Sequence, residues 1–219
     1  MRKLFQLLGL TNEQQTQSSR NKGTEFGMSG RKETQQSYGE DELNQNDSDH
    51  KMEFQNIDEE FAYNFTREGG KFMFCLSKKS LYSTLTQVLK EQGWNNIFIN
   101  EAEVHTLLEG CDDINELKAN GYAGTDVFIS TCDNLVAFNG RIMVSSNQCK
   151  NLNFSELPVN HIIIANHAQI VKNLGEGLRR INSKYFRNLP SKITTLKNKN
   201  TARNSGTSKN IYVFLLEDY

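Results

Sequence analysis

The sequence predicts an α/β fold with a Rossmann-like, mostly parallel β-sheet, helices on both faces and one antiparallel hairpin. Apolar runs of strand length alternate with helical segments of ten or more residues, and this alternation is typical of parallel strands joined by crossover helices. The hairpin is indicated by Asn139-Gly140, which separates two apolar runs, because Asn and Gly best tolerate the positive φ angles of a tight turn.

Three parts of the chain differ in composition. Residues 1–10 form a short amphipathic N-terminal segment that is too short to be a stable helix alone. We expect this segment to dock on protein, with weak anchoring at a membrane surface as the alternative. Residues 11–51 are rich in Gln, Asn, Ser and acidic residues and nearly lack aliphatic side chains, so they are predicted to be a flexible polar linker. The α/β domain is predicted to span residues 52–219.

Helices and strands alternate along the first half of the domain. Phe61 and Phe65 lie four residues apart in a segment whose first turn is acidic, which favours a helix at 57–68. Next come, in order, a strand at 71–76, a helix from 77 to 93, a strand at 96–100, a short helix at 101–109, and a weak strand or loop around 114–117. A serine opens the helix from 77 to 93 and a glycine ends it, as is usual at helix ends.

The second half carries the hairpin and the remaining strands. Val127, Phe128 and Ile129 form a short apolar run that is typical of a strand buried on both faces. The elements that follow are strands at 135–138 and 142–144, a polar loop at 147–156, a strand at 160–165, a helix from about 166 to 185, a short strand at 192–196, a basic loop at 198–209 and a last strand at 211–216.

Composition and motifs exclude several classes of protein. Lysine and arginine number 25 against 26 acidic residues, so the net charge of −1 gives no indication of a nucleic-acid partner. The four cysteines are widely spaced and form no C-x-x-C pair, which argues against a disulfide framework and against zinc or iron–sulfur ligation. No apolar run approaches the ~20 residues of a membrane span, and we identify no secretory signal. We therefore expect a cytoplasmic protein with reduced cysteines and no cofactor in this chain.

The candidate site follows the buried strand at 127–129. Residues 130–134 are small or polar, and ligands of open α/β sheets gather at the carboxyl ends of strands. The alternative is a solvated turn in which Asp133 and Asn134 bond their own backbone. Asp133 is the carboxylate that we nominate as a general base, and Cys132 is interpreted as a small buried filler.

A small anionic ligand is expected to lie against the glycine turns and polar side chains around this segment. The candidate ligand-binding residues are Gly124, Thr125, Thr131, Asn134, Asn139 and Arg203. Backbone N–H groups near the glycines would hold the anion, and the guanidinium group of Arg203 would neutralise its charge. The alternative interpretation of the basic stretch from 171 to 210 is a solvated basic face.

Several motifs, in their order and spacing, resemble the LUD domain, the LutC/YkgG lactate-utilisation family. They are G-x-x-G-T-D-V-F-I at 121–129, L-V-A-F-N-G-R at 135–141, L-P-V-N-H-I-I-I-A at 157–165, L-P-S-K-I-T-T-L at 189–196 and a closing V-F-L-L-E-D. The resemblance covers roughly residues 55–219. It implies a fold of the NagB/RpiA/CoA-transferase type and an accessory role in the oxidation of L-lactate. It also implies that iron–sulfur clusters belong to the partner oxidoreductase subunits.

The chain departs from the family pattern at two places. The family's glutamate, followed by Thr-Gly-Thr, is replaced by the segment 130–134, although a CoA-transferase-like mechanism requires a carboxylate nucleophile. The family's Gly-Pro-Ser-x-Thr loop is replaced by residues 197–206.

We therefore expect an accessory subunit of an L-lactate, or related hydroxy-acid, oxidation system. This subunit would bind a small carboxylate or an iron–sulfur partner protein. Two alternatives stay open. The first is a small-molecule enzyme of the sugar-phosphate isomerase or CoA-transferase-like type, with Asp133 as its base. The second is a pure protein-interaction module that uses residues 1–10. Whether the chain is an enzyme is not decided by its sequence.

Overall fold

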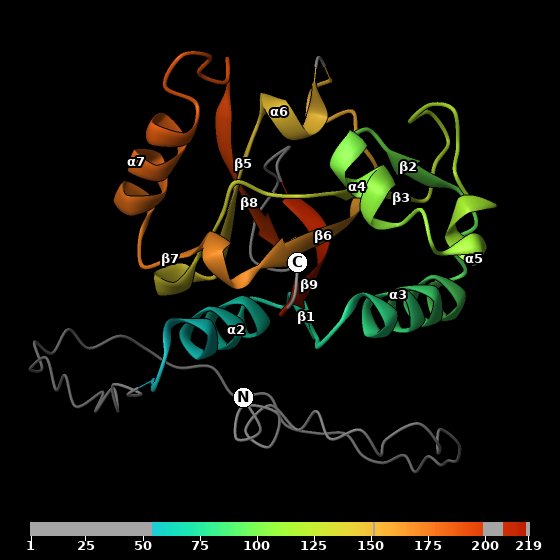
Figure 1. Cartoon of the computed structure of the whole chain (residues 1–219), viewed down its shortest axis with the longest axis horizontal. Coiled ribbons are helices and arrows are strands. Elements are labelled where there is room, and N and C mark those ends of the chain that lie inside the picture. Colours follow the sequence, from blue (N-terminus) through green and yellow to red (C-terminus); the bar gives the residue numbers. More distant parts are fainter. Residues whose placement is uncertain (1–53, 151, 199–207, 218–219) are drawn as a thin grey trace, which may run out of the picture. The chain divides into compact units, whose positions relative to one another are not determined.

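Two groups of strands share one long C-terminal strand in the computed structural model of the chain (Figure 1). The structure describes residues 54–150, 152–198 and 208–217. The predicted N-terminal segment 1–10, the predicted linker 11–51 and the predicted start of the domain at 52 lie outside the described residues.

The first group is a parallel sheet built around β9 (Ser208–Leu216). Along one side of β9 lies β6 (Asn160–Asn166), followed outward by β3 (Val127–Ser130) and β2 (Ile97–Ile99). The other side of β9 pairs with β1 (Lys71–Cys75), also in parallel. These strands confirm the predicted parallel sheet, and the side chains of β3 are buried along its whole length, as its apolar run indicated.

The second group branches from the beginning of β9. Its first strand, β8 (Ile193–Asn198), pairs with β9 only through its last two residues and runs antiparallel to β5 (Arg141–Ser145). Next to β5 lies β4 (Asn134–Val136), also antiparallel, and β7 (Ile170–Val171) pairs with β4 in parallel. The predicted antiparallel hairpin is therefore confirmed as β4 and β5.

Helices cover both faces of the parallel sheet, as predicted. On one face, α3 (Lys78–Gln92), α4 (Ala102–Leu107) and α5 (Asp112–Asn115) pack their apolar side chains against the central strands in one core. On the other face, Phe61 of α2 (Ile57–Arg67) contacts Phe72 of β1, with ring centroids 6.1 Å apart. None of the helices in the described ranges is long and apolar enough to cross a lipid bilayer.

The second group of strands has a helix of its own. The buried side chain of Ile181, on α7 (Leu174–Lys184), packs with Val136, Met143 and Val171 in a separate apolar cluster. This packing holds α7 beside the strands of the hairpin, and it places one face of the helix next to the end of β3, where the candidate site lies.

Four local predictions were wrong. The weak strand or loop around 114–117 begins as the helical turn α5, and the loop at 147–156 begins with α6 (Ser146–Cys149). The helix predicted from 166 starts only at Leu174, because Ile170 and Val171 pair with β4 as a strand. The hairpin turns through the 3₁₀ helix η1 (Ala137–Asn139) and a left-handed Gly140, so it lacks the expected two-residue turn.

Candidate functional site

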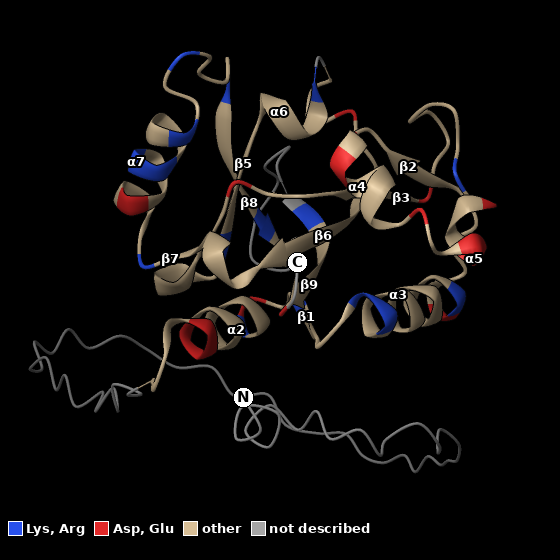
Figure 2. Ribbon diagram, in the orientation of Figure 1, with Lys and Arg blue, Asp and Glu red and all other residues tan. Residues whose placement is uncertain are grey.

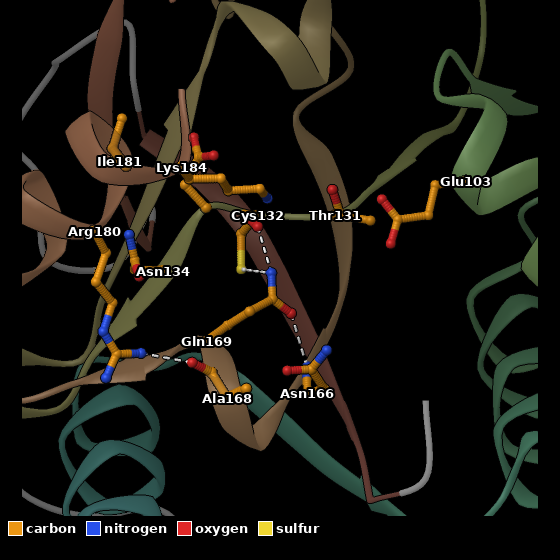
Figure 3. A pocket seen from close by; sticks show the side chains of 11 residues that line it. Glu103, Thr131, Cys132, Asn134, Asn166, Ala168, Gln169, Arg180, Ile181 and Lys184 are labelled. Atoms are coloured by element: carbon orange, nitrogen blue, oxygen red, sulfur yellow. Dashed lines mark hydrogen bonds between the residues drawn. The ribbon is translucent and has the colours of Figure 1, made fainter. Parts of the chain in front are cut away.

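A cavity of about 350 Å³ lies at the carboxyl ends of β3 and β6 (Figure 3). Its walls come from the segment between β3 and β4, from the end of β6 with the turn after it, from α7 and from α4. The lining residues are Glu103, Thr131, Cys132, Asp133, Asn134, Asn166, Ala168, Gln169, Arg180, Ile181 and Lys184. The position matches the usual ligand site of open α/β sheets, and the volume falls within the range of small-molecule sites.

The segment after β3 is a rigid wall of the cavity. The backbone N–H of Asp133 donates to the carbonyl of Met143 at 2.9 Å. The amide group of Gln169 donates through Nε2 to the carbonyl of Cys132 and accepts through Oε1 from the N–H of Asn166 at 2.9 Å (Figure 3). Asp133 is 7% exposed and Asn134 2%, so the alternative of a solvated turn was wrong.

Asp133 carries an unfilled hydrogen-bond acceptor at this wall. Its Oδ1 accepts from the hydroxyl of Tyr185 at 3.0 Å. Its Oδ2 is buried and makes no hydrogen bond within the part of the chain that the structure describes. A buried polar atom without a partner costs free energy, and such atoms are rare in folded proteins. This oxygen is therefore a natural position for a donor group of a ligand.

Lys184, at the end of α7, brings a positive charge to the same cavity. Burial lowers the pKa of Lys184, but Tyr185 and the charge of Asp133 raise it by more, so the pKa lies above its usual value. The side chain stays charged at neutral pH. Arg180, one turn earlier, donates to the carbonyl of Ala168 at 2.6 Å and pairs with Glu176 at 2.9 Å. The cavity thus has a cationic wall on α7, facing the acidic and polar wall after β3.

Glu101 is a buried carboxyl group behind the cavity that the sequence analysis missed. It lies two residues after the end of β2 and is 9% exposed. Its two oxygens accept from the backbone N–H of Thr131 at 2.7 Å and from the Thr131 hydroxyl at 2.6 Å. Burial raises the pKa of Glu101 to about 7, although the hydrogen bonds from Thr131 oppose the rise. The sequence did contain a signal for Glu101: polar residues follow the buried strand β2, as they follow β3, and such residues at the carboxyl ends of parallel strands indicate a site.

Cys132 lines the cavity but is no candidate nucleophile. Its side chain is 1% exposed, and burial raises the pKa of its thiol well above the usual range, with the charge of Asp133 adding to the effect. The thiolate is the reactive form of cysteine, so a thiol held neutral in this way is inert.

Only part of the predicted set of site residues meets in the cavity. Thr131, Asp133 and Asn134 line it together. Gly124 and Thr125 precede β3, so they lie at the opposite end of that strand.

Two further candidates also lie elsewhere. Asn139 is part of η1 and lines a smaller cavity beside Phe65 and Gly140. Arg203 lies outside the described residues. Within the described cavity the positive charges come from Arg180 and Lys184, and the basic character of the stretch from 171 onward was the sequence signal for them.

Comparison with known proteins agrees with this architecture. The family model of the LUD domain matches residues 59–215. The solved structure of a DUF162 family protein from Deinococcus radiodurans is similar, with a TM-score of 0.52 and 16% identity, over 73% of this chain and 96% of that chain. At this identity the likeness shows a shared Rossmann-like α/β fold. No curated protein matched the chain. Since the family model spans the described sheet from α2 to β9, the chain belongs to the LUD domain family.

Proposed function

We propose that this chain is an accessory subunit of a hydroxy-acid oxidation system and that it binds a small 2-hydroxy acid, such as L-lactate, in the cavity after β3. The LUD domain family is linked in general to lactate utilisation. The observation that carries the proposal is the buried, unfilled acceptor Oδ2 of Asp133 next to the charged Lys184. An iron–sulfur partner protein would perform the oxidation itself.

A 2-hydroxy acid offers the two groups that these residues require. Its carboxylate is neutralised by the ammonium group of Lys184, and its hydroxyl donates to Oδ2 of Asp133. Leaving a buried acceptor unfilled costs about 1–3 kcal/mol, so filling it favours a ligand with a hydroxyl by that amount. A 2-oxo acid has no such hydrogen and would place its carbonyl oxygen against the carboxylate. Since about 1.4 kcal/mol is a factor of ten, the site should prefer L-lactate to pyruvate by roughly 5-fold to 150-fold.

Isothermal titration calorimetry of both acids against matched variants tests the proposal. Asp133→Asn should reduce or reverse the preference for L-lactate, because the amide N–H can donate to the carbonyl of pyruvate. Lys184→Gln should weaken both acids, since it removes the charge that both require. Lys172→Gln, an exposed position that does not line the cavity, is the control. Wild-type protein that binds the two acids equally, or a preference that Asp133→Asn leaves intact, would contradict the proposal.

One observation favours a second function, a proton-transfer enzyme of the isomerase type. A carboxyl group with a pKa of about 7, such as that of Glu101, can both give and accept protons at neutral pH. Glu101 is linked to the cavity by a hydrogen bond, which it accepts from the hydroxyl of the cavity residue Thr131. Such an enzyme would exchange a C–H hydrogen of its bound ligand with solvent. Proton NMR of pyruvate or of sugar phosphates in D₂O would show a decay of that signal, and Glu101→Gln should stop it. A signal that stays constant with wild-type protein rejects this function.

A further inference from the structure

Helix α7 and the loop after it present a strongly basic surface. The five cations of α7 and the loop 185–192 are all exposed and are Arg179, Arg180, Lys184, Arg187 and Lys192. Arg180 and Lys184 also line the cavity, so Arg179, Arg187 and Lys192 are the cations that belong to this surface alone. The only acid in this stretch of sequence is Glu176, which pairs with Arg180. Figure 2 shows these lysines and arginines along the helix and its loop. Because the whole chain has a net charge of −1, so many cations in one stretch mark a local concentration of positive potential.

Large apolar side chains are exposed among these cations. Phe186 is 81% exposed, Leu189 is 56% exposed and Leu178 is 43% exposed. Phe186 and Leu189 lie in the short loop that follows α7, where the N–H of Asn188 donates to the carbonyl of Tyr185 at 2.7 Å. The buried positions of α7 are Gly177 and Ile181, so the exposed apolar residues are not part of the core. Apolar side chains gathered in this way mark an interaction surface.

We propose that α7 and the loop 185–192 form a docking surface for an anionic lipid bilayer. Lysine and arginine are attracted to anionic headgroups, and apolar side chains at the tip of a basic loop insert at the boundary between headgroups and acyl chains. A bilayer suits this composition, because Arg187 lies in the same short loop as the exposed side chains of Phe186 and Leu189, and positive charge beside exposed apolar groups is what an anionic membrane interface binds. The inference does not depend on the ligand proposed for the cavity.

Co-sedimentation of the full chain with phosphatidylcholine vesicles, with and without phosphatidylglycerol, tests the surface. The test variants avoid the cavity residues Arg180 and Lys184. We expect the wild-type protein to bind the anionic vesicles at low salt and to be released at high salt. The double variant Arg179→Gln/Arg187→Gln should bind about 30-fold more weakly, since each cation near an anionic membrane contributes about fivefold.

Two further variants separate the apolar contribution and general charge. Phe186→Ser/Leu189→Ser should also lose binding, because nothing then inserts into the bilayer. Lys78→Gln/Lys79→Gln removes two exposed cations at the start of α3 and should bind as the wild type does. Unchanged melting temperatures show that the variants fold.

Each of the other results overturns the proposal. The proposal is wrong if the wild-type protein does not sediment with anionic vesicles. It is also wrong if the control pair at Lys78 and Lys79 loses as much binding as the variant at Arg179 and Arg187. Retention on immobilised polyglutamate without any binding to vesicles would assign the surface to an acidic protein instead.

Discussion

Replacing Glu101 by glutamine measures how strongly the fold perturbs a carboxyl group beside the cavity. Burial raises the pKa of Glu101 from 4.5 to about 7. Each pKa unit corresponds to about 1.4 kcal/mol. The free energy of unfolding should therefore be about 3 kcal/mol larger when Glu101 is protonated than when it is ionised. This is a large part of the free energy of unfolding of a typical domain, which is roughly 5–15 kcal/mol.

The direction of the effect follows from where the proton binds. The unfolded chain ionises Glu101 above pH 4.5, whereas the folded protein holds it protonated up to about pH 7. The stability that this group contributes is therefore fully present below pH 4.5 and is lost as the pH rises through 7. The Glu101→Gln variant cannot ionise, and its side-chain carbonyl still accepts from the N–H of Thr131. Relative to the variant, the wild-type protein should become less stable by about 3 kcal/mol across this window, with no further change above it.

Urea unfolding at a series of pH values on both sides of this window provides the measurement. The fluorescence of Trp94, the only tryptophan, reports unfolding because its side chain is 8% exposed in the folded protein. Glu109→Gln removes a carboxylate from an exposed position nearby and controls for the loss of one negative charge. A difference between the wild type and Glu101→Gln that does not vary with pH would refute the reasoning, since it would mean that burial leaves the pKa of Glu101 unchanged.

Further predictions concern the turn after β4, the thiols and the wall of the cavity. Gly93→Ala should lower the free energy of unfolding by roughly 1 kcal/mol, and Gly140→Ala should lower it by at least twice as much. Both glycines have a left-handed backbone, but only at 140 would an added Cβ lie 2.4 Å from the backbone nitrogen of Phe65. Equal losses in urea would contradict this. All four cysteines are buried, so none should react rapidly with Ellman's reagent in the folded protein, and all four should react in urea. A thiol that reacts rapidly before unfolding would contradict this prediction. Tyr185→Phe removes the hydroxyl that donates to Oδ1 of Asp133 and should cost roughly 1–2 kcal/mol by the same urea assay, whereas an unchanged stability would show that water replaces the hydroxyl.

Many elements of this fold could be predicted because their signals are local. The helix α3 begins after Ser77, whose side chain accepts from the N–H of Ser80, and it ends at Gly93 with φ 67. Both ends follow from residue chemistry within one turn of the chain. The polar residues after β3 could likewise be placed in the site, because a buried strand that ends in small polar residues predicts where the edge of the sheet lies.

The remainder depended on which strands become neighbours. Ile170 and Val171 suit one face of a helix, yet they form β7 because the edge of β4 is available to them. Glu101 reaches Thr131 across 30 residues of sequence, and Tyr185 reaches Asp133 across 52. Periodicity, caps and turn residues act between near neighbours, so the sequence by itself determined the α/β class and most elements. The order of strands brings distant side chains together, and only the tertiary structure decided which carboxylates and cations meet at the cavity.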